Sequence, residues 1–439
     1  MSKILVISYL FPPSGGVGVA RTVGYAKYFP RHAETYVLAP SNAGTPVQDH
    51  GLLELIPRET TVVRAFSPTI PYAFRDRVWK RIVGTANGRP KTAAPAHNQA
   101  GGNGLKQVVK RAIENVISPD PQALWVPFAM RQARKVIRRH GIDTVLLLAP
   151  PFSLLRLVVD LKAEFPGVRF ITDFRDEVRY YLKHLDHVPS AERLAQVEQL
   201  EERALRCSEY ISAVTWEQVD LIRTRYPFLP KEKFLCVPNG FDPDVFGRFA
   251  GKPPRRDKLV IAYFGSVYTV PICSPEAFLD AAALLGEEDR QSLEIRFVGR
   301  VASDAQSYLQ NRPYRIVQTG FLPLAEGLRQ LEDADYLLLV GDHPTTLGGK
   351  TLDYLATGKP IIAITPPGGV IARLLDRTGA GWPVDNDRDT ILAFLTKACQ
   401  WWRSGEPPPG FKPNRAAVDS YSRANIVAEL AQSLGLSLS

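Results

Sequence analysis

The chain has 439 residues, of which 45% are hydrophobic and 23% are charged, and its formal net charge is +9 at pH 7. This length and balance predict a globular protein of two large domains, and no apolar run reaches the ~20 residues that span a bilayer. The four cysteines have no paired spacing, which argues against a zinc site or a disulfide framework and fits a reducing cytosol.

The excess of Lys and Arg indicates anionic partners: nucleotide phosphates, anionic lipid headgroups or nucleic acid. Nucleic acid is disfavoured, because the basic residues cluster in one segment and do not follow a groove-sized element. The first apolar run, residues 4–7, is short and is followed by a Pro- and Gly-rich turn. We therefore expect a first strand and no signal peptide.

The N-terminal region has the pattern of a Rossmann-type opening. Residues 3–10 predict a buried strand, 11–18 a loop, 19–29 an amphipathic helix and 36–40 the next strand. The glycine spacing differs from G-x-G-x-x-G and no acidic residue closes the second strand, so a dinucleotide site is not expected. The adjacent Gly15 and Gly16 let a ligand or a facing domain approach the backbone closely. The alternative is a tight turn without a ligand.

Residues 67–122 interrupt the alternation of strands and helices. Two basic, partly apolar pieces, 74–83 and 105–113, flank a Gly/Ala/Asn/Pro-rich stretch that predicts a mobile loop. Apolar positions at helical spacing beside Lys and Arg favour an interfacial segment on an anionic membrane. The alternative is a solvated helix pair packed on the N-terminal domain.

Two further strands of the N-terminal half end in residues suited to a ligand site. The first, 144–148, precedes Pro150, Pro151 and Phe152, and the second, 169–172, precedes Asp173, Arg175 and Asp176. Groups at the carboxyl end of a parallel strand lie where open α/β sheets bind ligands.

A second α/β series follows a linker at 251–257. Its predicted strands are residues 259–264, 293–298, 315–318, 335–340 and 360–364, with Gly265 and Arg300 in the turns after the first two. The fourth strand leads through a polar loop to a short helix that Gly358 and Pro360 end.

The start of this short helix, Gly348-Gly349-Lys350-Thr351, is the strongest candidate site in the chain. Unpaired backbone N–H groups at a helix start face an anion, and Lys350 adds positive charge there. Asp353, one turn later, offers a carboxylate suited to sugar hydroxyls. The functional interpretation is a nucleotide-sugar site, and the alternative is an ordinary strand–helix–strand crossover with surface charges.

Taken in order, the motifs resemble the GT-B-fold retaining glycosyltransferases, specifically the family 4 glycosyltransferases of bacterial polysaccharide synthesis. The resemblance extends over nearly the whole chain. Its motifs are Phe11–Gly16, Pro150-Pro151, Asp173–Asp176, Asn239–Asp242, Phe264-Gly265, Phe297–Gly299, Gly320, Lys350–Pro360, Gly379–Gly381 and the helix after Tyr421-Ser422-Arg423.

The resemblance implies an α/β protein of two Rossmann-like domains that face each other across a cleft. Residues 1–250 are the expected acceptor domain, with the basic insertion at 67–122. Residues 251–415 are the expected nucleotide-sugar domain, and 416–439 the C-terminal helix that crosses back to the N-terminal domain.

The resemblance also implies roles for single residues. Lys350 would hold the diphosphate and act in catalysis with Asp173 and Arg175, and Asp353 would hold the ribose. No metal and no cofactor is expected, because cationic side chains and helix ends neutralise the leaving diphosphate. The full donor-side set is Gly15, Gly16, Gly265, Arg300, Thr345, Gly348, Gly349, Lys350, Thr351 and Asp353, and the acceptor-side set is Pro150, Pro151, Phe152 and Asp176.

The chain departs from the family pattern at several positions. Thr345 and Asp353 stand where the family has two glutamates with seven residues between them. No Arg follows Gly265 closely, and we expect Arg300 to replace it as the second phosphate cation. Phe152 stands where the family often has His. The sequence Asp333-Ala334-Asp335 lies at the start of a buried strand and is not expected to bind a metal.

We therefore expect a cytoplasmic, metal-independent, retaining glycosyltransferase that uses a UDP- or GDP-sugar. The favoured acceptor is a lipid-linked glycan of exopolysaccharide, capsule or O-antigen synthesis, reached by attachment of the basic insertion to the inner face of the cytoplasmic membrane. The alternatives are a transferase acting on a soluble natural product and a catalytically inactive GT-B binding protein.

Overall fold

The computed structural model describes residues 2–41, 48–68, 120–183, 191–247, 249, 251, 257–267, 269, 274–303, 305–341, 343–406 and 408–437. The chain divides into two compact units: the first comprises Met1–Ser212, Arg225–Leu235 and Leu436–Ser439, and the second Ala213–Thr224 and Cys236–Gly435. The boundary expected near residue 250 lies inside the second unit. The basic insertion lies almost wholly outside the described residues and stays a prediction.

The first unit is built on a largely parallel sheet with the strand order β3-β2-β1-β4-β5-β6-β7. Apolar runs form its central strands, and the side chains of β1 and β4 are almost wholly buried. The strands are β1 (Lys3–Ile7), β2 (Glu34–Pro40), β3 (Thr61–Ala65), β4 (Thr144–Ala149), β5 (Arg169–Phe174), β6 (Tyr210–Ala213) and β7 (Phe234–Cys236).

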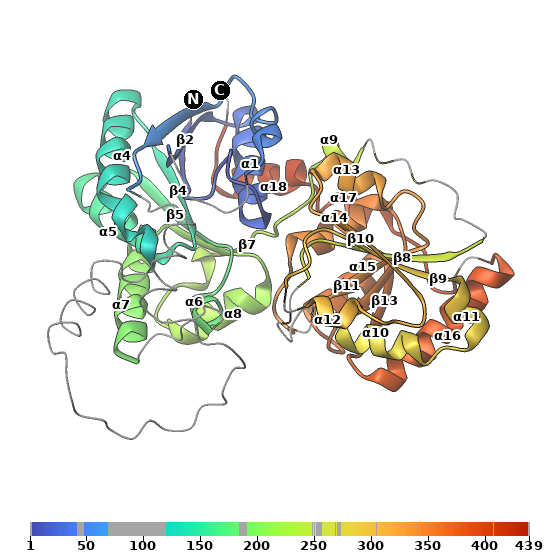
Figure 1. Cartoon of the computed structure of the whole chain (residues 1–439). Coiled ribbons are helices and arrows are strands. Elements are labelled where there is room, and N and C mark those ends of the chain that lie inside the picture. Colours follow the sequence, from blue (N-terminus) through green and yellow to red (C-terminus); the bar gives the residue numbers. More distant parts are fainter. Residues whose placement is uncertain are drawn as a thin grey trace, which may run out of the picture. The chain divides into compact units, whose positions relative to one another are not determined.

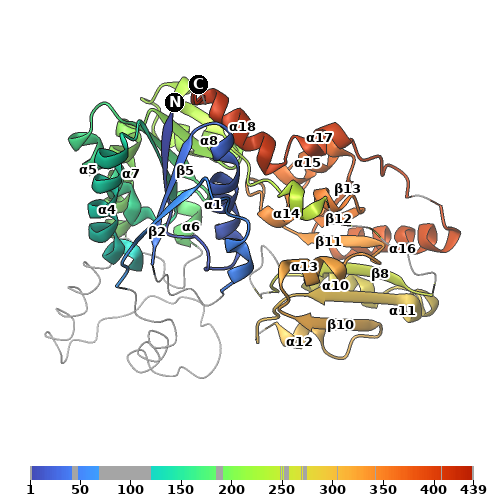
Figure 2. The same cartoon turned by 90° about the horizontal axis from the view of Figure 1, so that it is seen from above.

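Helices cover both faces of this sheet (Figure 2). Helices α4 (Val126–His140), α5 (Leu155–Glu164) and α7 (Ala191–Cys207) form one layer, and α1 (Val17–Tyr28) packs on the opposite face. The short helices of the unit are α6 (Val178–Lys183), η1 (Phe29–Arg31), η2 (His50–Leu53), η3 (Pro121–Trp125), η4 (Phe152–Leu154) and η5 (Lys231–Lys233).

The second unit repeats the same topology with the strand order β10-β9-β8-β11-β12-β13 (Figure 1). Its sheet reverses direction of winding between β8 and β11, as the first does between β1 and β4, and such switch points are where open α/β sheets bind ligands. The strands are β8 (Leu259–Phe264), β9 (Leu293–Val298), β10 (Arg315–Gly320), β11 (Tyr336–Val340), β12 (Ile361–Ile364) and β13 (Gly381–Val384).

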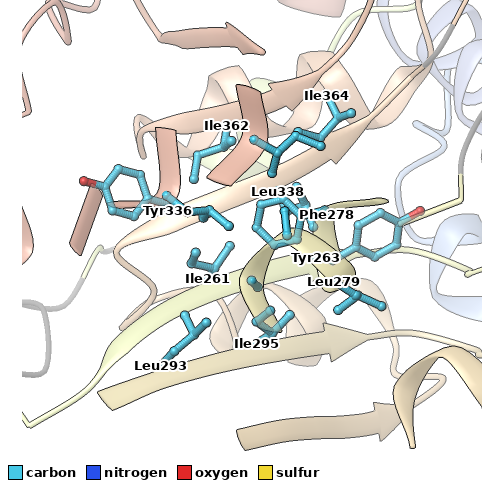
Figure 3. Close-up of a cluster of buried hydrophobic side chains, with 14 of the residues drawn as sticks. Ile261, Tyr263, Phe278, Leu279, Leu293, Ile295, Tyr336, Leu338, Ile362 and Ile364 are labelled. Carbon is cyan, nitrogen blue, oxygen red and sulfur yellow. The ribbon is translucent and has the colours of Figure 1, made fainter. Parts of the chain in front are cut away.

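Alternate side chains of β8 enter two separate cores, one on each face of the sheet. Leu259, Ile261 and Tyr263 pack with α10 (Glu276–Ala283) and α16 (Arg388–Ser404), and Figure 3 shows Ile261 and Tyr263 in this cluster. Val260 and Ala262 belong to the other core. That core includes residues of α9 (Pro243–Phe246), α14 (Gly349–Thr357), α15 (Val370–Thr378) and α17 (Arg415–Asp419). This two-sided burial explains the unbroken apolar strand sequences.

The remaining helices of the second unit lie at its ends and between its strands. They are α8 (Trp216–Arg225), α11 (Glu287–Ser292), α12 (Gln306–Leu309), α13 (Leu324–Arg329) and α18 (Arg423–Ser433). After α18 the chain rejoins the first unit, where the backbone N–H of Ser2 donates to the Ser437 carbonyl oxygen at 3.3 Å. Among the described helices, none has the length and apolar character needed to cross a bilayer.

Candidate functional site

Lys350 lies in the first turn of α14, at the carboxyl edge of the second sheet. Gly348 precedes the helix in an extended conformation and forms no side-chain cap, so the helix start remains open to an anion. The Lys350 ammonium lies 3.8 Å from the centroid of the Tyr263 ring. A Cβ atom at Gly265 would meet Lys350 Cε at 2.9 Å and Nζ at 3.1 Å. The structure thus brings together three predicted donor-side residues: Gly265, Gly348 and Lys350.

Two turns are joined backbone to backbone beneath this lysine. Gly265 and Gly299 have φ angles of 132° and 143°, and a side chain on Gly299 would collide with the Gly265 carbonyl oxygen. The N–H of Gly265 donates to Val298 O at 2.8 Å, and the N–H of Val267 donates to Arg300 O at 2.9 Å. Arg300 is exposed in the second of these turns. Both predicted phosphate cations therefore belong to this cluster of turns.

Tyr354 holds α14 against the strand ends, although the sequence analysis does not single it out. Its buried hydroxyl accepts from the Phe264 N–H at 2.7 Å and lies 3.3 Å from the Leu338 carbonyl oxygen. These contacts tie one turn of α14 to both β8 and β11, which flank the switch point. Lys350 lies one turn earlier on the same helix, so Tyr354 fixes the place from which the ammonium reaches Gly265.

Asp353, in the second turn of α14, is partly buried near Arg423 and Asp242. Burial raises the pKa of its carboxyl to about 6; the negative charge of Asp242 adds to this effect and the positive charge of Arg423 opposes it. No hydrogen bond is formed by this carboxylate within the described part of the chain. It retains the capacity to accept hydrogen bonds from a bound ligand, and its ribose role stays a prediction.

The loop between β11 and α14 carries a histidine that sequence reasoning does not identify. The Nδ1 atom of His343 lies 3.2 Å from both the Thr345 and the Thr346 hydroxyls, and 3.3 Å from the Thr345 backbone nitrogen. The Thr345 carbonyl oxygen accepts from the Thr215 hydroxyl at 2.9 Å. Thr345 thus presents a hydroxyl held by an imidazole, where the family pattern has a carboxylate.

A second cationic helix start lies in the first unit, at the amino end of α1. Gly16 caps this helix with φ 100°, and the first turn contains no acidic residue. A side chain on Gly18 would overlap with the guanidinium of Arg175, so this cation packs directly on the first turn. The backbone N–H of Arg175 donates to Ala149 O at 2.8 Å, which joins the ends of β4 and β5. Arg175 and the predicted Gly15-Gly16 loop therefore belong to one site.

Comparison with known proteins adds a partial sequence match. No family model matches the sequence. Over 156 residues the chain is 29% identical to the probable glycosyltransferase WbjE of Pseudomonas aeruginosa. This match covers 35% of the chain and 38% of WbjE, so the chain matches less than two fifths of the length of this curated relative.

Solved structures match over almost the entire chain. HepE from Anabaena, in its complex with UDP, has a TM-score of 0.59 at 13% identity and covers 99% of this chain and 100% of its own. WaaG, a glycosyltransferase involved in lipopolysaccharide biosynthesis, has a TM-score of 0.57 at 12% identity and covers 98% of both chains. The chain has the GT-B fold. The expected fold class is thereby confirmed.

Asp173, predicted to be catalytic, is a buried structural group within this GT-B chain. The Arg21 guanidinium of α1 binds it through two atoms, with Nε–Oδ2 at 2.7 Å and Nη2–Oδ1 at 2.6 Å. Tyr25 and Ser212 donate to the same carboxylate at 3.0 Å and 2.7 Å. Asp173 has no exposed surface, so we correct its role from catalysis to positioning α1 against β5.

The acceptor-side residues of the GT-B chain also require a correction. Phe152 is buried, and its ring packs against Phe174 and Tyr181 with centroids 6.4 Å and 5.4 Å apart. It therefore belongs to the core, as do the buried Pro150 and Pro151 that precede it. Asp176 is partly exposed and pairs with Arg175 Nε at 3.0 Å, which leaves it at the edge of the cationic site.

Replacing Asp173 with Asn is expected to destabilise the protein by about 3–5 kcal/mol, because it removes the carboxylate charge that balances the buried Arg21 guanidinium. The measurement is the midpoint of urea denaturation followed by circular dichroism. Asp176→Asn is the matched control, and we expect it to cost roughly 0–1 kcal/mol because its pair with Arg175 is partly exposed. An Asp173→Asn protein of full stability would contradict the structural role.

Proposed function

We propose that this protein is a retaining, metal-independent glycosyltransferase that moves a sugar from a UDP- or GDP-sugar to a glycan acceptor. One observation carries the proposal: the Lys350 side chain packs against Gly265, where any larger residue would displace it, and Lys350 lies at the open start of α14. An ammonium and a helix start at a topological switch point together suit the diphosphate of a nucleotide.

Known proteins of similar fold support this choice of ligand. HepE is described in complexes with UDP, with UDP and glucose, and with UDP-glucose. WbjE is a probable glycosyltransferase, and WaaG is involved in lipopolysaccharide biosynthesis. We infer a nucleotide-sugar donor and a polysaccharide-type acceptor for this chain, in a family 4-like reaction in the cytoplasm.

In the proposed reaction the bond between the anomeric carbon and the diphosphate oxygen breaks, through an oxocarbenium-like state. The acceptor oxygen bonds to the same face of the sugar, and its proton passes to the departing diphosphate. Lys350 and the backbone N–H groups of the α14 start neutralise the charge that develops on that diphosphate. Arg300, in the adjoining turn, supplies a second cation. These groups would supply the leaving-group stabilisation that a metal ion provides in other transferases.

The acceptor proposal rests on the outer surface of the first unit. Helix α4 contains five Arg or Lys residues and no Asp or Glu. Arg131, Lys135 and Arg139, spaced four residues apart on one face, are exposed and form no ion pair with any described residue. Phe66 and Phe128, which are 56% and 39% exposed, pack edge to face at the amino end of this helix, with centroids 5.3 Å apart.

Basic residues beside exposed aromatic rings suit an anionic membrane surface. We propose peripheral attachment of the first unit to the inner face of the cytoplasmic membrane, where a lipid-linked glycan would be the acceptor. The basic insertion between β3 and α4 would add to this surface. The alternative is a soluble acceptor, and binding to vesicles distinguishes the two.

The central test is a donor screen with purified protein. Thermal stabilisation is measured with UDP-glucose, UDP-N-acetylglucosamine, GDP-mannose, UDP and GDP. The three nucleotide sugars are then tested for slow hydrolysis, once in EDTA and once with added Mn²⁺. We expect one nucleotide sugar to raise the melting temperature and to be hydrolysed in EDTA. Binding without hydrolysis would favour the inactive binding protein, and hydrolysis that requires Mn²⁺ would contradict the metal-independent mechanism.

Lys350→Ala is expected to weaken binding of that nucleotide sugar by about 1.5–3 kcal/mol, because one charge-assisted contact with the diphosphate is lost. Hydrolysis should fall at least as far, since the same charge stabilises the leaving group. The measurement is isothermal titration, and Lys397→Ala, an exposed lysine on α16, is the matched control. Equal affinity in the two variants would remove Lys350 from the site.

Binding of the nucleotide sugar should strengthen as the pH rises through about 6, the raised pKa of the Asp353 carboxyl. Below that pH the group is protonated, and it loses the charge-assisted hydrogen bonds to the ribose hydroxyls. A nucleotide sugar is used because its diphosphate, unlike that of free UDP, carries no proton that titrates near this pH. Asp353→Asn should flatten the profile, and a flat profile in the unmodified protein would contradict the ribose role.

Sedimentation with vesicles tests membrane attachment. The protein should bind vesicles that contain anionic phosphatidylglycerol at low salt, release at high salt and ignore neutral vesicles, because basic side chains contribute roughly 1 kcal/mol each. A variant with Arg131, Lys135 and Arg139 all changed to Glu should bind on the order of a hundredfold more weakly, because three such contributions are lost. In the control variant, Arg388, Lys397 and Arg403 on α16 are changed to Glu, and its binding should stay close to that of the unmodified protein. Equal binding to both vesicle types would rule out this mechanism and favour a soluble acceptor.

A further inference from the structure

Trp216, the first residue of α8, has an exposed indole in the second unit. Its side chain is 58% exposed, and it forms no ring contact or hydrogen bond with any described residue. Single exposed hydrophobic residues are common on protein surfaces and need no explanation by themselves. The position of this tryptophan is unusual because both of its neighbours in the chain are tethered to loops at the carboxyl edge of the sheet.

The preceding residue ties the start of α8 to the loop after β11. The Thr215 hydroxyl accepts from the Gln218 N–H at 3.2 Å, which caps the helix, and donates to Thr345 O at 2.9 Å. Thr215 is only 3% exposed, so this double contact is shielded from solvent. The backbone at Trp216 is therefore fixed beside Thr345.

The following residue ties α8 to the loop after β12. The Glu217 carboxylate pairs with Arg373, whose guanidinium also donates to the Gly368 carbonyl oxygen. The two loops are joined to each other, because the Val370 N–H donates to Pro344 O at 3.0 Å. Trp216 is thus held between two connected loops, at the edge of the sheet where ligands of this architecture bind.

The groups of the loop to which the start of α8 is tied are suited to hydroxyl-rich ligands. Thr345 and Thr346 offer hydroxyls, and His343 offers an imidazole that contacts both of them. This loop leads within five residues to Lys350, where the proposed function places the diphosphate. A sugar attached to that diphosphate would extend along the loop, with polar partners for its hydroxyls and an aromatic surface for the apolar face of its ring.

We propose that Trp216 stacks on the sugar ring of the bound donor and contributes to the choice of that sugar. This inference rests on the proposed function, because it takes the diphosphate site at Lys350 as the starting point. It also accounts for the departure at Thr345: a hydroxyl stands where the family has a carboxylate, and the neighbouring tryptophan would bind the ring instead. Trp216 is a specificity residue and takes no part in bond breaking.

The test compares affinities for a nucleotide with and without its sugar. Isothermal titration with UDP and with UDP-glucose, or with the nucleotide and sugar that stabilise best in the donor screen, is carried out on Trp216→Ala, Trp216→Phe and unmodified protein. Trp216→Ala should bind the nucleotide sugar roughly five- to tenfold more weakly and the free nucleotide unchanged. Trp216→Phe should restore most of the affinity, because it keeps an aromatic face.

Leu221→Ala is the matched control, since Leu221 lies on the same helix and is 44% exposed; it should affect neither ligand. An equal loss for both ligands in Trp216→Ala would show that the residue only supports the Thr345 loop, and would overturn the proposal. No loss for either ligand would also overturn it. Failure of the unmodified protein to bind any nucleotide is a separate result, which rejects the proposed function itself.

Discussion

The contact between Lys350 and Gly265 is the constraint on which the candidate site depends. The ammonium occupies space that any side chain at position 265 would take, and the backbone there has φ 132°, which favours glycine. Gly299 beneath it has the same requirement, because its α-carbon packs on the Gly265 carbonyl. Gly265 therefore leaves room for the end of the Lys350 side chain after β8, and Gly299 lets the turn after β9 pack closely on Gly265.

This arrangement requires α14 to be fixed along its axis. The Tyr354 hydroxyl provides the restraint, because it binds the backbone of β8 and lies close to that of β11, where the sheet has its switch point. Burial raises the pKa of this hydroxyl well above its usual value, so it remains protonated and keeps its donor. Lys350, the two glycines and Tyr354 therefore depend on one another, and none of these residues would identify the site by itself.

Sequence patterns predict the fold well because local and long-range signals agree. Apolar runs followed by Gly, Pro or polar turns predict both sheets, and the structure places β8, β9 and β11 within one residue of their expected bounds at each end. The first strand ends at Ile7, three residues before its expected end, because Ser8 turns its hydroxyl to the Leu10 carbonyl oxygen at 3.0 Å and begins the loop.

Single-residue roles are harder to predict, because partners far apart in sequence decide them. Asp173 has the position of a ligand-binding group at a strand end, yet Arg21, 152 residues earlier, neutralises it in the core. Phe152 follows a predicted ligand-binding turn, yet its ring completes an aromatic cluster with Phe174. Neither pairing leaves a local signal, since a buried arginine and an exposed one look the same in a helix sequence.

Both units contain a cationic helix start, so the nucleotide site that we propose has two candidate positions. Each has a glycine turn, a helix start and a cation: Gly16, α1 and Arg175 in the first, and Gly265, α14 and Lys350 in the second. The ribose contact that we predict also requires a carboxylate that is not already paired. In the first unit Asp173 is neutralised by Arg21 and Asp176 by Arg175.

In the second unit Asp353 remains without a hydrogen bond to any described residue, one turn from Lys350. The second unit therefore has three groups that suit a nucleotide: a cation for the phosphates, a carboxylate for the ribose and an open helix start. The first unit has only the groups for a phosphate or another simple anion. This difference supports the proposal of a nucleotide site in the second unit, on chemical grounds that do not depend on how the two units are placed.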